Sequence, residues 1–154
     1  MSLQTDHETS TGAPAQKLER GLGPRLLRLE QPHPNRIYLT VAPGDHVAAA
    51  VFLFDELSAR LATASAVDHR DHLEINYHFA LDGDRCVVTV KTFAPKPEPH
   101  LESLARMIAG AEWIEREIAD LFGCRFDGHP RPERLILADD WPADRHPLRR
   151  GGPS

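Results

Sequence analysis

Residues 73–94 read LEINYHFALDGDRCVVTVKTFA, and this stretch carries the clearest secondary-structure pattern in the chain. From Leu73 to Leu81, large apolar side chains alternate with smaller or polar ones, which is typical of a strand with one buried face. Asp82-Gly83 then supplies a dipeptide that is preferred in two-residue hairpin loops. The stretch therefore predicts a β-hairpin that contributes one apolar face to the core.

A two-residue loop also predicts how the two strands pair. Counting back from it places Phe79 opposite Cys86 on the apolar face, while Glu74 meets Lys91 on the other face. On this register Cys86 is a small core residue rather than a reactive thiol.

The neighbouring segments predict the rest of the fold. Residues 36–41, RIYLTV, alternate in the same way and lead into a Pro-Gly turn, so they predict a strand. From residue 46 to residue 64, apolar side chains recur every three or four positions, which predicts an amphipathic helix. A second short helix is predicted at 100–110, after a loop interrupted by prolines. Together these elements predict an α+β fold in which a small mixed sheet with a β-hairpin is packed by two or three helices.

The two ends of the chain differ from this middle part, because prolines are concentrated there. Residues 1–35 mix Ser, Thr and Gly with prolines and predict a mobile N-terminal tail. Residues 36–126 form the predicted α+β domain. Residues 127–154 hold five prolines and one short apolar run, which predicts an extended, proline-rich C-terminal arm. Composition leaves open whether this arm binds a partner or folds back over its own domain.

Composition and charge exclude several classes of function. A formal net charge of −5, without a dense Lys/Arg block, argues against a nucleic-acid partner. Cys86 and Cys124 are too few for a disulfide framework or an iron-sulfur cluster. The longest uncharged apolar run, residues 47–54, is far shorter than the roughly 20 residues of a membrane-spanning helix. Residues 1–16 lack the features of a secretory signal, so we expect a cytosolic protein.

Residues 112–122, EWIEREIADLF, predict a third helix in which charged residues interrupt an apolar pattern. Gly123 supplies the expected end of this helix. A helical wheel places Glu112, Arg116 and Asp120 in a ladder of opposite charges on the outer face, which needs no functional explanation. The apolar face collects the remaining large side chains: Trp113, Ile114, Ile118, Leu121 and Phe122.

The same wheel places Glu117 at the edge of the apolar face, where a carboxylate must be paired or raise its pKa. Three hypotheses follow. Glu117 could act as a general acid or base, or it could bind a metal with His129 or with the histidines of residues 69–72. The third hypothesis, which the chemistry favours, is that Glu117 anchors an arginine of the C-terminal arm.

The C-terminal part of the chain also resembles a known protein family. Several blocks in succession carry the resemblance, which is more specific than any single short motif. They are Glu115-Arg116-Glu117, Asp120-Leu121-Phe122-Gly123, Gly128-His129-Pro130, Arg134-Leu135-Ile136-Leu137, Asp139-Asp140-Trp141 and His146-Pro147-Leu148-Arg149. They resemble the signature of the C subunit of respiratory complex I, the NADH:quinone oxidoreductase.

This resemblance implies an accessory subunit without a redox centre of its own. Such subunits lie in the peripheral arm on the cytoplasmic side of the membrane, and reach the membrane only through the complex. They bind the large, hydrogenase-derived quinone-site subunit near iron-sulfur subunits, and FMN, iron-sulfur clusters and quinone belong to the complex. No catalytic, cofactor or metal residues are then expected here. The implied assembly residues are Glu115, Arg116, Glu117, Asp120, Phe122, Gly128, His129, Pro130, Arg134, Asp140, Trp141, Pro147, Leu148 and Arg149.

Two departures from the family pattern keep an alternative open. Ala119 stands where an aromatic residue often precedes the aspartate, and Arg149-Arg150 continues into Gly151-Gly152 rather than an acidic residue. The sequence ADDWPADRHPLR also resembles that of the related subunit of membrane-bound nickel-iron hydrogenases and formate hydrogenlyase. A different class of protein, a small enzyme using Glu117 and His129, is the third possibility.

Overall fold

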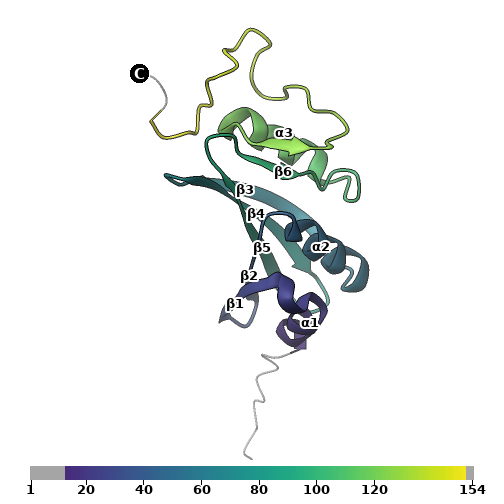
Figure 1. Cartoon of the computed structure of the whole chain (residues 1–154). Coiled ribbons are helices and arrows are strands. Elements are labelled where there is room, and N and C mark those ends of the chain that lie inside the picture. The colour runs from purple at the N-terminus through teal and green to yellow at the C-terminus, as the bar shows by residue number, and fades with distance from the viewer. Residues whose placement is uncertain (1–12, 152–154) are drawn as a thin grey trace, which may run out of the picture.

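The structure is a computed structural model that describes residues 13–151, which fold into two sheets and three α-helices (Figure 1). The predicted α+β class and the mixed sheet are therefore confirmed. In chain order, the elements are α1 Ala13–Leu22, a 3-10 turn Gly23–Arg25, β1 Leu26–His33, β2 Arg36–Val41, α2 Asp45–Val51, a π-helical turn Phe52–Glu56, β3 Arg60–Asp68, β4 His72–Leu81, β5 Cys86–Pro95, β6 His100–Glu102, α3 Ala111–Phe122 and β7 Arg125–Asp127.

The large sheet has the strand order β1-β2-β5-β4-β3. Strands β2 and β5 run parallel, whereas the other neighbours are antiparallel. The second sheet contains β6 and β7, which run parallel to each other and are connected by α3. Helix α3 is thus the crossover of a compact β-α-β unit that follows the large sheet in the chain.

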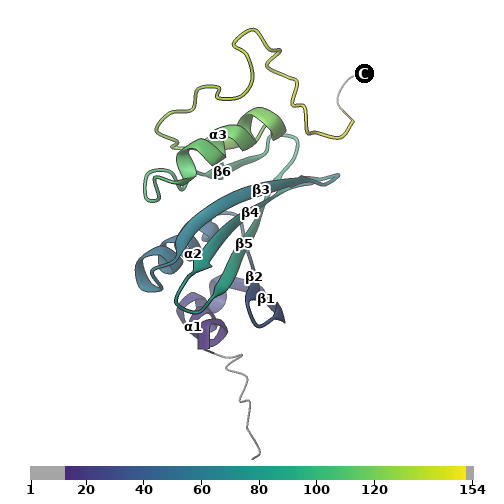
Figure 2. The ribbon, with the colours of Figure 1, turned by 180° about the vertical axis from the view of Figure 1, so that it is seen from behind.

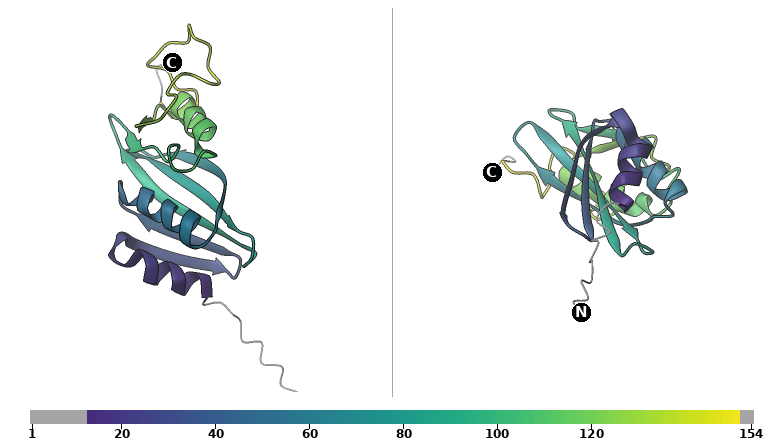
Figure 3. Two further views of the ribbon diagram at one scale, coloured as in Figure 1. Left: turned by 90° about the vertical axis from the view of Figure 1, so that its right-hand side faces the viewer. Right: turned by 90° about the horizontal axis from the view of Figure 1, so that it is seen from below.

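The helices cover one face of the large sheet. Helices α1 and α2 lie on this face, and the view from behind shows the strands in front of them (Figures 2 and 3). Tyr77 of β4 connects two of the helices, because its ring stacks on His46 of α2 while its hydroxyl donates a hydrogen bond to Glu115 of α3. The core on this side includes Leu18, Ile37, Leu53 and Phe79, which are all fully buried. No helix within residues 13–151 combines the length and the apolar character that a membrane crossing needs.

The predicted hairpin is present as β4 and β5, but the predicted register is wrong by two residues. Cys86 pairs with Leu81 instead of Phe79, and Glu74 lies opposite Phe93 instead of Lys91. The connection is longer than a two-residue loop, because residues 82–85 form the turn and Arg85 adopts a positive φ of 50°. A shift of two residues keeps every side chain on its face, so Cys86 is still buried as predicted.

The predicted N-terminal tail is wrong from residue 13 onward. Residues 13–22 form α1, which buries Leu18 and Leu22, and residues 26–33 form β1 along the edge of the sheet. Prolines did not prevent this, because Pro14 lies in the first helical turn and Pro32 lies in an edge strand where the pairing with β2 is irregular. Residues 1–12 of the predicted tail lie outside the described part of the chain.

Two predicted helices also need correction. The helix predicted over 46–64 ends its regular part at Val51, and Ser58, with a positive φ of 52°, separates it from strand β3. The segment 100–110 begins with strand β6 and continues in turns instead of a helix. In both places, pairing with a strand from another part of the chain overrides the local helical spacing.

Helix α3 spans Ala111–Phe122, which confirms the third predicted helix. Gly123 ends it in the left-handed conformation, with φ 72°, and its N–H binds the carbonyl of Ala119. The chain beyond β7 does not form the predicted extended arm. Residues 128–151, the C-terminal segment, contain neither helix nor strand, and they turn repeatedly and return along α3 (Figure 1).

Gly123→Ala should lower the free energy of unfolding by about 1–3 kcal/mol. Alanine is strained at this positive φ, and its Cβ would collide with the His146 ring of the C-terminal segment. Urea unfolding measures the change. Gly110→Ala is the matched control at the other end of α3, where φ is negative and a Cβ meets open space. Equal stability of the two variants would contradict this packing.

Candidate functional site

Helix α3 buries three of its charged residues and exposes part of its predicted apolar face. Glu115 is fully buried, and Arg116 and Asp120 are each only 8% exposed, whereas Trp113 is 60% exposed. Glu117, which the helical wheel placed at a buried edge, points to solvent. The wheel is wrong because α3 has two covered sides: the sheet lies on one and the C-terminal segment on another (Figure 3). The predicted outer charge ladder is therefore wrong: Arg116 and Asp120 are buried and bind backbone groups of the C-terminal segment, while Glu112 pairs with Arg131.

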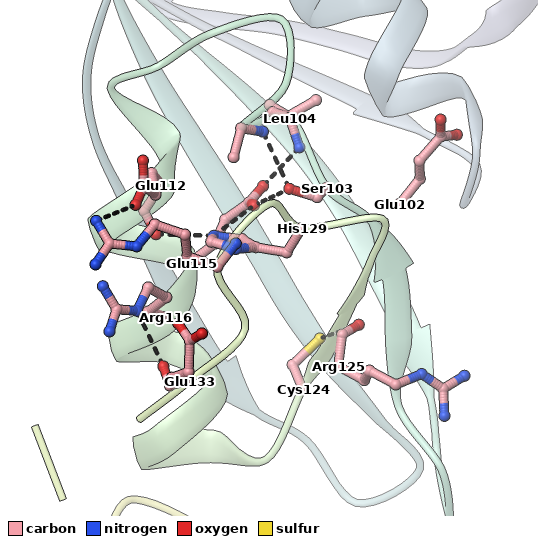
Figure 4. Close-up of polar contacts among 12 residues, drawn as sticks. Glu102, Ser103, Leu104, Glu112, Glu115, Arg116, Cys124, Arg125, His129 and Glu133 are labelled. Atoms are coloured by element: carbon pink, nitrogen blue, oxygen red, sulfur yellow. Dashed lines mark hydrogen bonds and ion pairs between the residues drawn. The ribbon is translucent and has the colours of Figure 1, made fainter. Parts of the chain in front are cut away.

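Glu115 is the centre of a buried polar cluster (Figure 4). Its Oε1 accepts hydrogen bonds from the Tyr77 hydroxyl at 3.0 Å and from the Leu104 N–H at 2.8 Å. Its Oε2 accepts a short hydrogen bond from the Ser103 hydroxyl and lies 3.8 Å from His129 Nε2. Burial raises the pKa of Glu115, although these hydrogen bonds oppose the shift. The cluster attaches α3 to strand β4 and to the turn after β6.

The surroundings of Glu115 also suppress ionisation of its neighbours. Burial, together with the adjacent Glu115 carboxyl group, raises the pKa of Tyr77 well above its ordinary value. The same two causes raise the pKa of Cys124 to about 12. A thiol with such a pKa is protonated near neutral pH, so Cys124 is not a nucleophile there. The cluster has the properties of a structural connection rather than of a reactive site.

Arg116 and Asp120 hold the C-terminal segment by its backbone. The Arg116 guanidinium donates to the carbonyls of Glu133 at 2.9 Å and Arg134 at 3.1 Å. The Asp120 carboxylate accepts three successive N–H groups, those of residues 135–137, at 2.8–3.1 Å. Successive N–H groups directed at one anion form a strong backbone cradle. The hypothesis that Glu117 anchors an arginine of the arm is therefore corrected: Arg116 and Asp120 are the anchors.

The end of the C-terminal segment caps α3. The last carbonyls of a helix have no partners inside the helix, and positive groups are favourable beside them. Here the carbonyl of Asp120 binds His146 Nδ1 at 3.0 Å, and the carbonyl of Leu121 accepts the Leu148 N–H at 3.0 Å. The carbonyl of Phe122 accepts a hydrogen bond from the Arg149 guanidinium. These contacts explain why an irregular segment follows the helix so closely.

Other predicted site residues shape the turns of the segment. His129 donates from Nε2 to the carbonyl of Glu112 at 2.9 Å and accepts the Arg131 N–H at Nδ1, an arrangement that fixes its tautomer. Gly128, just before it, has a positive φ of 76°. Arg134 donates to the carbonyl of Ala138, and the Trp141 indole donates to the carbonyl of Arg145. Further predicted residues are solvent-exposed and their side chains make no such contact: Glu117, Pro130, Asp140, Pro147 and Leu148.

Four large apolar side chains outside these contacts are exposed to solvent. They are Trp113 of α3 and Ile136, Trp141 and Leu148 of the C-terminal segment, which are 39–60% exposed. Sequence reasoning missed Trp113 and Ile136 as surface residues and missed Tyr77 and Ser103 as partners of the buried carboxylate. Ser103 carried no signal, because only the fold brings it to α3. Ile136 lies in the apolar run 135–137 of the segment, but nothing in that run indicates which of its side chains is exposed.

Within the described residues, Glu117 lacks the partners that the metal and acid-base hypotheses require. No group of three or more His, Cys, Asp or Glu residues within residues 13–151 is placed to hold a metal ion. His129 approaches Glu115 rather than Glu117. His69 and His72 stack on each other, and each pairs with a nearby carboxylate, Glu74 and Asp71 respectively.

Removing the Glu115 side chain should destabilise the fold far more than removing its charge. We expect Glu115→Ala to cost about 2–4 kcal/mol, since Tyr77, Ser103 and Leu104 would lose a buried partner. Glu115→Gln keeps acceptors there and should cost less. Because the folded pKa of Glu115 lies above its ordinary 4.5, the wild type should lose stability relative to Glu115→Gln as pH rises above 4.5. Urea unfolding at several pH values tests this, and an opposite slope would contradict it.

Asp120→Ala should release the C-terminal segment. Three backbone N–H groups lose their acceptor, so we expect a loss of about 1–3 kcal/mol and faster trypsin cleavage after Arg134 and Arg145. Limited proteolysis followed by mass spectrometry measures the rate. Glu117→Ala changes an exposed residue on the same helix and is the control. Trypsin should cleave this variant at the same rate as the wild type. Identical cleavage of both variants would show that Asp120 does not hold the segment.

Comparison with known proteins supports the resemblance noted in the sequence. The family described as "Respiratory-chain NADH dehydrogenase, 30 Kd subunit" matches residues 39–153. The NADH-quinone oxidoreductase C subunit of Chloroherpeton thalassium is 38% identical over 108 residues, which are 67% of this chain and 44% of that protein. The same-named protein of Trichlorobacter lovleyi is 30% identical over 148 residues, 93% of this chain and 90% of the relative.

Two further relatives are much longer. The NADH-quinone oxidoreductase C/D subunit of Methylococcus capsulatus is 36% identical over 110 residues, 65% of this chain and 18% of that protein. Hydrogenase-4 component G of Escherichia coli is 30% identical over 129 residues, 81% of this chain and 23% of that protein. The chain thus spans less than half of three of these four relatives.

Solved structures show the same fold. A chain of an archaeal membrane-bound sulfane sulfur reductase matches 88% of this protein and 81% of its own length with a TM-score of 0.77 and 21% identity. A trypsin-resistant fragment of Nqo5 matches 77% of this protein and 98% of its own length with a TM-score of 0.66 and 20% identity. Together, the matched family, these relatives and the motifs on α3 and the C-terminal segment lead to one conclusion: the chain belongs to the 30 Kd subunit family of respiratory-chain NADH dehydrogenase, which is related to hydrogenase-4 component G.

Proposed function

We propose that this chain is an accessory subunit of the peripheral arm of a proton-translocating NADH:quinone oxidoreductase. Its role is to bind the large, hydrogenase-derived subunit that forms the quinone site, together with neighbouring iron-sulfur subunits. The observation that carries the proposal is the arrangement on α3. Arg116 and Asp120 hold an irregular segment by its backbone, and this leaves Trp113 and Ile136 exposed on α3 and on the segment. Exposed aromatic and aliphatic side chains on a rigid support are typical anchors of protein interfaces.

The name of one relative supports the choice of partner. The Methylococcus capsulatus protein is called a C/D subunit, and this chain matches only 18% of it. A name that joins the C and D subunits fits two subunits that work directly beside each other. We assign the large quinone-site subunit to this neighbouring position in the complex.

The proposal assigns no chemistry to this chain. The carboxylate with the strongest burial, Glu115, is committed to structural hydrogen bonds, and the buried thiol of Cys124 is held protonated. FMN, the iron-sulfur clusters and quinone are accordingly assigned to other subunits. We place the chain at the cytoplasmic side of the membrane, attached through its partners.

A second candidate is the equivalent subunit of a membrane-bound hydrogenase or formate hydrogenlyase. The similarity to Hydrogenase-4 component G of Escherichia coli, at 30% identity over 129 residues, favours it. The two candidates share the assembly role and differ in the electron donor and acceptor of the complex. A small enzyme that uses Glu117 and His129 is not supported, because Glu117 is exposed and His129 binds backbone groups.

Affinity purification of the tagged full chain from mild-detergent extracts of its native cells tests the proposal. We expect mass spectrometry to find the large quinone-site subunit together with the NADH- and FMN-binding subunits. Recovery of that large subunit with hydrogenase or formate-oxidising subunits would instead support the second candidate. A chain recovered without partners would contradict both.

Surface variants identify the contact. Trp113→Ser with Ile136→Ser should reduce the recovered partner several-fold, because buried apolar anchors dominate the stability of an interface. Leu27→Ser with Phe54→Ser is the matched control, since these side chains are 60% and 43% exposed but lie on other elements, β1 and the turn after α2. Equal recovery with both double variants would show that the partner binds elsewhere.

A further inference from the structure

The end of the C-terminal segment and the loop after β3 enclose a groove. One hollow of about 490 Å³ is lined by Lys96, Trp141, residues 144–147 and residues 149–151, and a second of about 470 Å³ lies between Arg70 and Gly151. The two hollows share Lys96, Arg150 and Gly151, so they form one continuous groove. Most of the lining side chains from the C-terminal segment are exposed, so the groove is open to solvent.

The groove is strongly basic although the chain as a whole carries a net charge of −5. Within residues 13–151, Lys96 is the one lining cation that pairs with a carboxylate, that of Asp68 at 2.6 Å. The remaining lining cations, Arg70, Arg145, Arg149 and Arg150, form no ion pair there. Asp144 is the other acidic side chain of the lining. A local excess of positive charge therefore stands on a negatively charged molecule.

A buried carboxylate holds two of the residues that form the wall of this groove. The Asp68 carboxylate, almost fully buried, binds the Lys96 ammonium and also accepts the Arg150 N–H at 2.7 Å. Burial raises the pKa of Asp68, but these two contacts outweigh burial and hold that pKa below its ordinary value. The backbone at Arg150 is thereby tied to strand β3. This tie fixes the backbone that carries the Arg150 side chain at the groove, so this part of the wall need not be ordered by the ligand.

We infer that this groove binds an acidic, extended segment of a partner protein, an inference that rests on the proposed assembly function. Guanidinium groups bind carboxylates in bidentate geometry, so several unpaired arginines along one groove suit successive Asp or Glu side chains. Trp141, which lines the larger hollow and is 39% exposed, would pack against the apolar parts of such a segment.

The shape of the groove favours a protein segment over a membrane surface. The cations lie in a hollow, and the exposed carboxylate of Asp144 stands among them. A flat layer of anionic headgroups would meet Asp144 together with the arginines, whereas an extended chain can follow the hollow between them. Charges that are exposed to salt act over roughly 8–10 Å, so the groove attracts an acidic segment locally in spite of the negative net charge.

A binding titration of the full chain tests the inference directly. The probe is a fluorescent synthetic peptide of alternating Glu and Gly, and a Gln-Gly peptide serves as the neutral reference. We expect saturable binding of the acidic peptide that weakens with added salt. Arg145→Ser with Arg150→Ser should weaken it about fivefold, the effect of losing two exposed charge contacts. Arg20→Ser with Arg106→Ser, which removes the same charge from exposed sites elsewhere, should leave binding close to that of the wild type.

Three outcomes would overturn the inference. They are absence of saturable binding, equal weakening by both double variants, and displacement of the peptide by phosphatidylglycerol vesicles at lower concentrations than by free acidic peptide. Purification from native cells separates this inference from the proposed function. The double variant Arg145→Ser with Arg150→Ser is compared with the wild type. If both proteins keep their partners up to the same salt concentration, the groove does not bind the partner, although the proposed assembly function still holds. If the wild type has no partner, the assembly function fails, and the titration still decides whether the groove binds acidic chains.

Discussion

The carboxylate of Asp120 is the interaction on which the C-terminal part of the structure depends. A chain segment without helix or strand must still find partners for its backbone polar groups, because unpaired buried ones are costly. Asp120 accepts three of these N–H groups, Arg116 donates to two carbonyls, and the free carbonyls at the end of α3 bind the rest of the segment. Since Asp120 and Arg116 bind backbone atoms, the side chain of Ile136 remains free to face outward.

A second buried carboxylate, Glu115, connects α3 to the large sheet. It receives hydrogen bonds from strand β4 and from the turn after β6, so it fixes α3 to the large sheet and to that turn. Three layers result: the sheet, then α3, then the segment (Figure 3). Glu115 therefore binds the sheet and the turn after β6, whereas Asp120 binds the C-terminal segment. These contacts explain why charged residues interrupt the apolar pattern of α3. The segment held in this way forms the outer layer beside α3 (Figure 3).

Local sequence predicted the elements that local interactions determine. Helix α3 with its Gly123 stop and the hairpin of β4 and β5 were found in this way, because their patterns are long and regular. Elements whose structure depends on residues distant in the sequence were not predicted. Strand β1 gains its order by pairing with β2, and β6 by pairing with β7. In the site, the wheel treated α3 as a helix with one covered side, so Glu117 was chosen where Glu115 is the buried acid.

Hydrogen-deuterium exchange of the free chain and of the chain within its purified complex tests the central claim most directly. If α3 preorganises the C-terminal segment, the amides of residues 135–137 are already protected in the free chain. Complex formation then adds protection mainly around Trp113 and at the outer turns of the segment. Rapid exchange of residues 135–137 in the free chain, with protection appearing only in the complex, would contradict the account, because the partner rather than Asp120 would then order the segment.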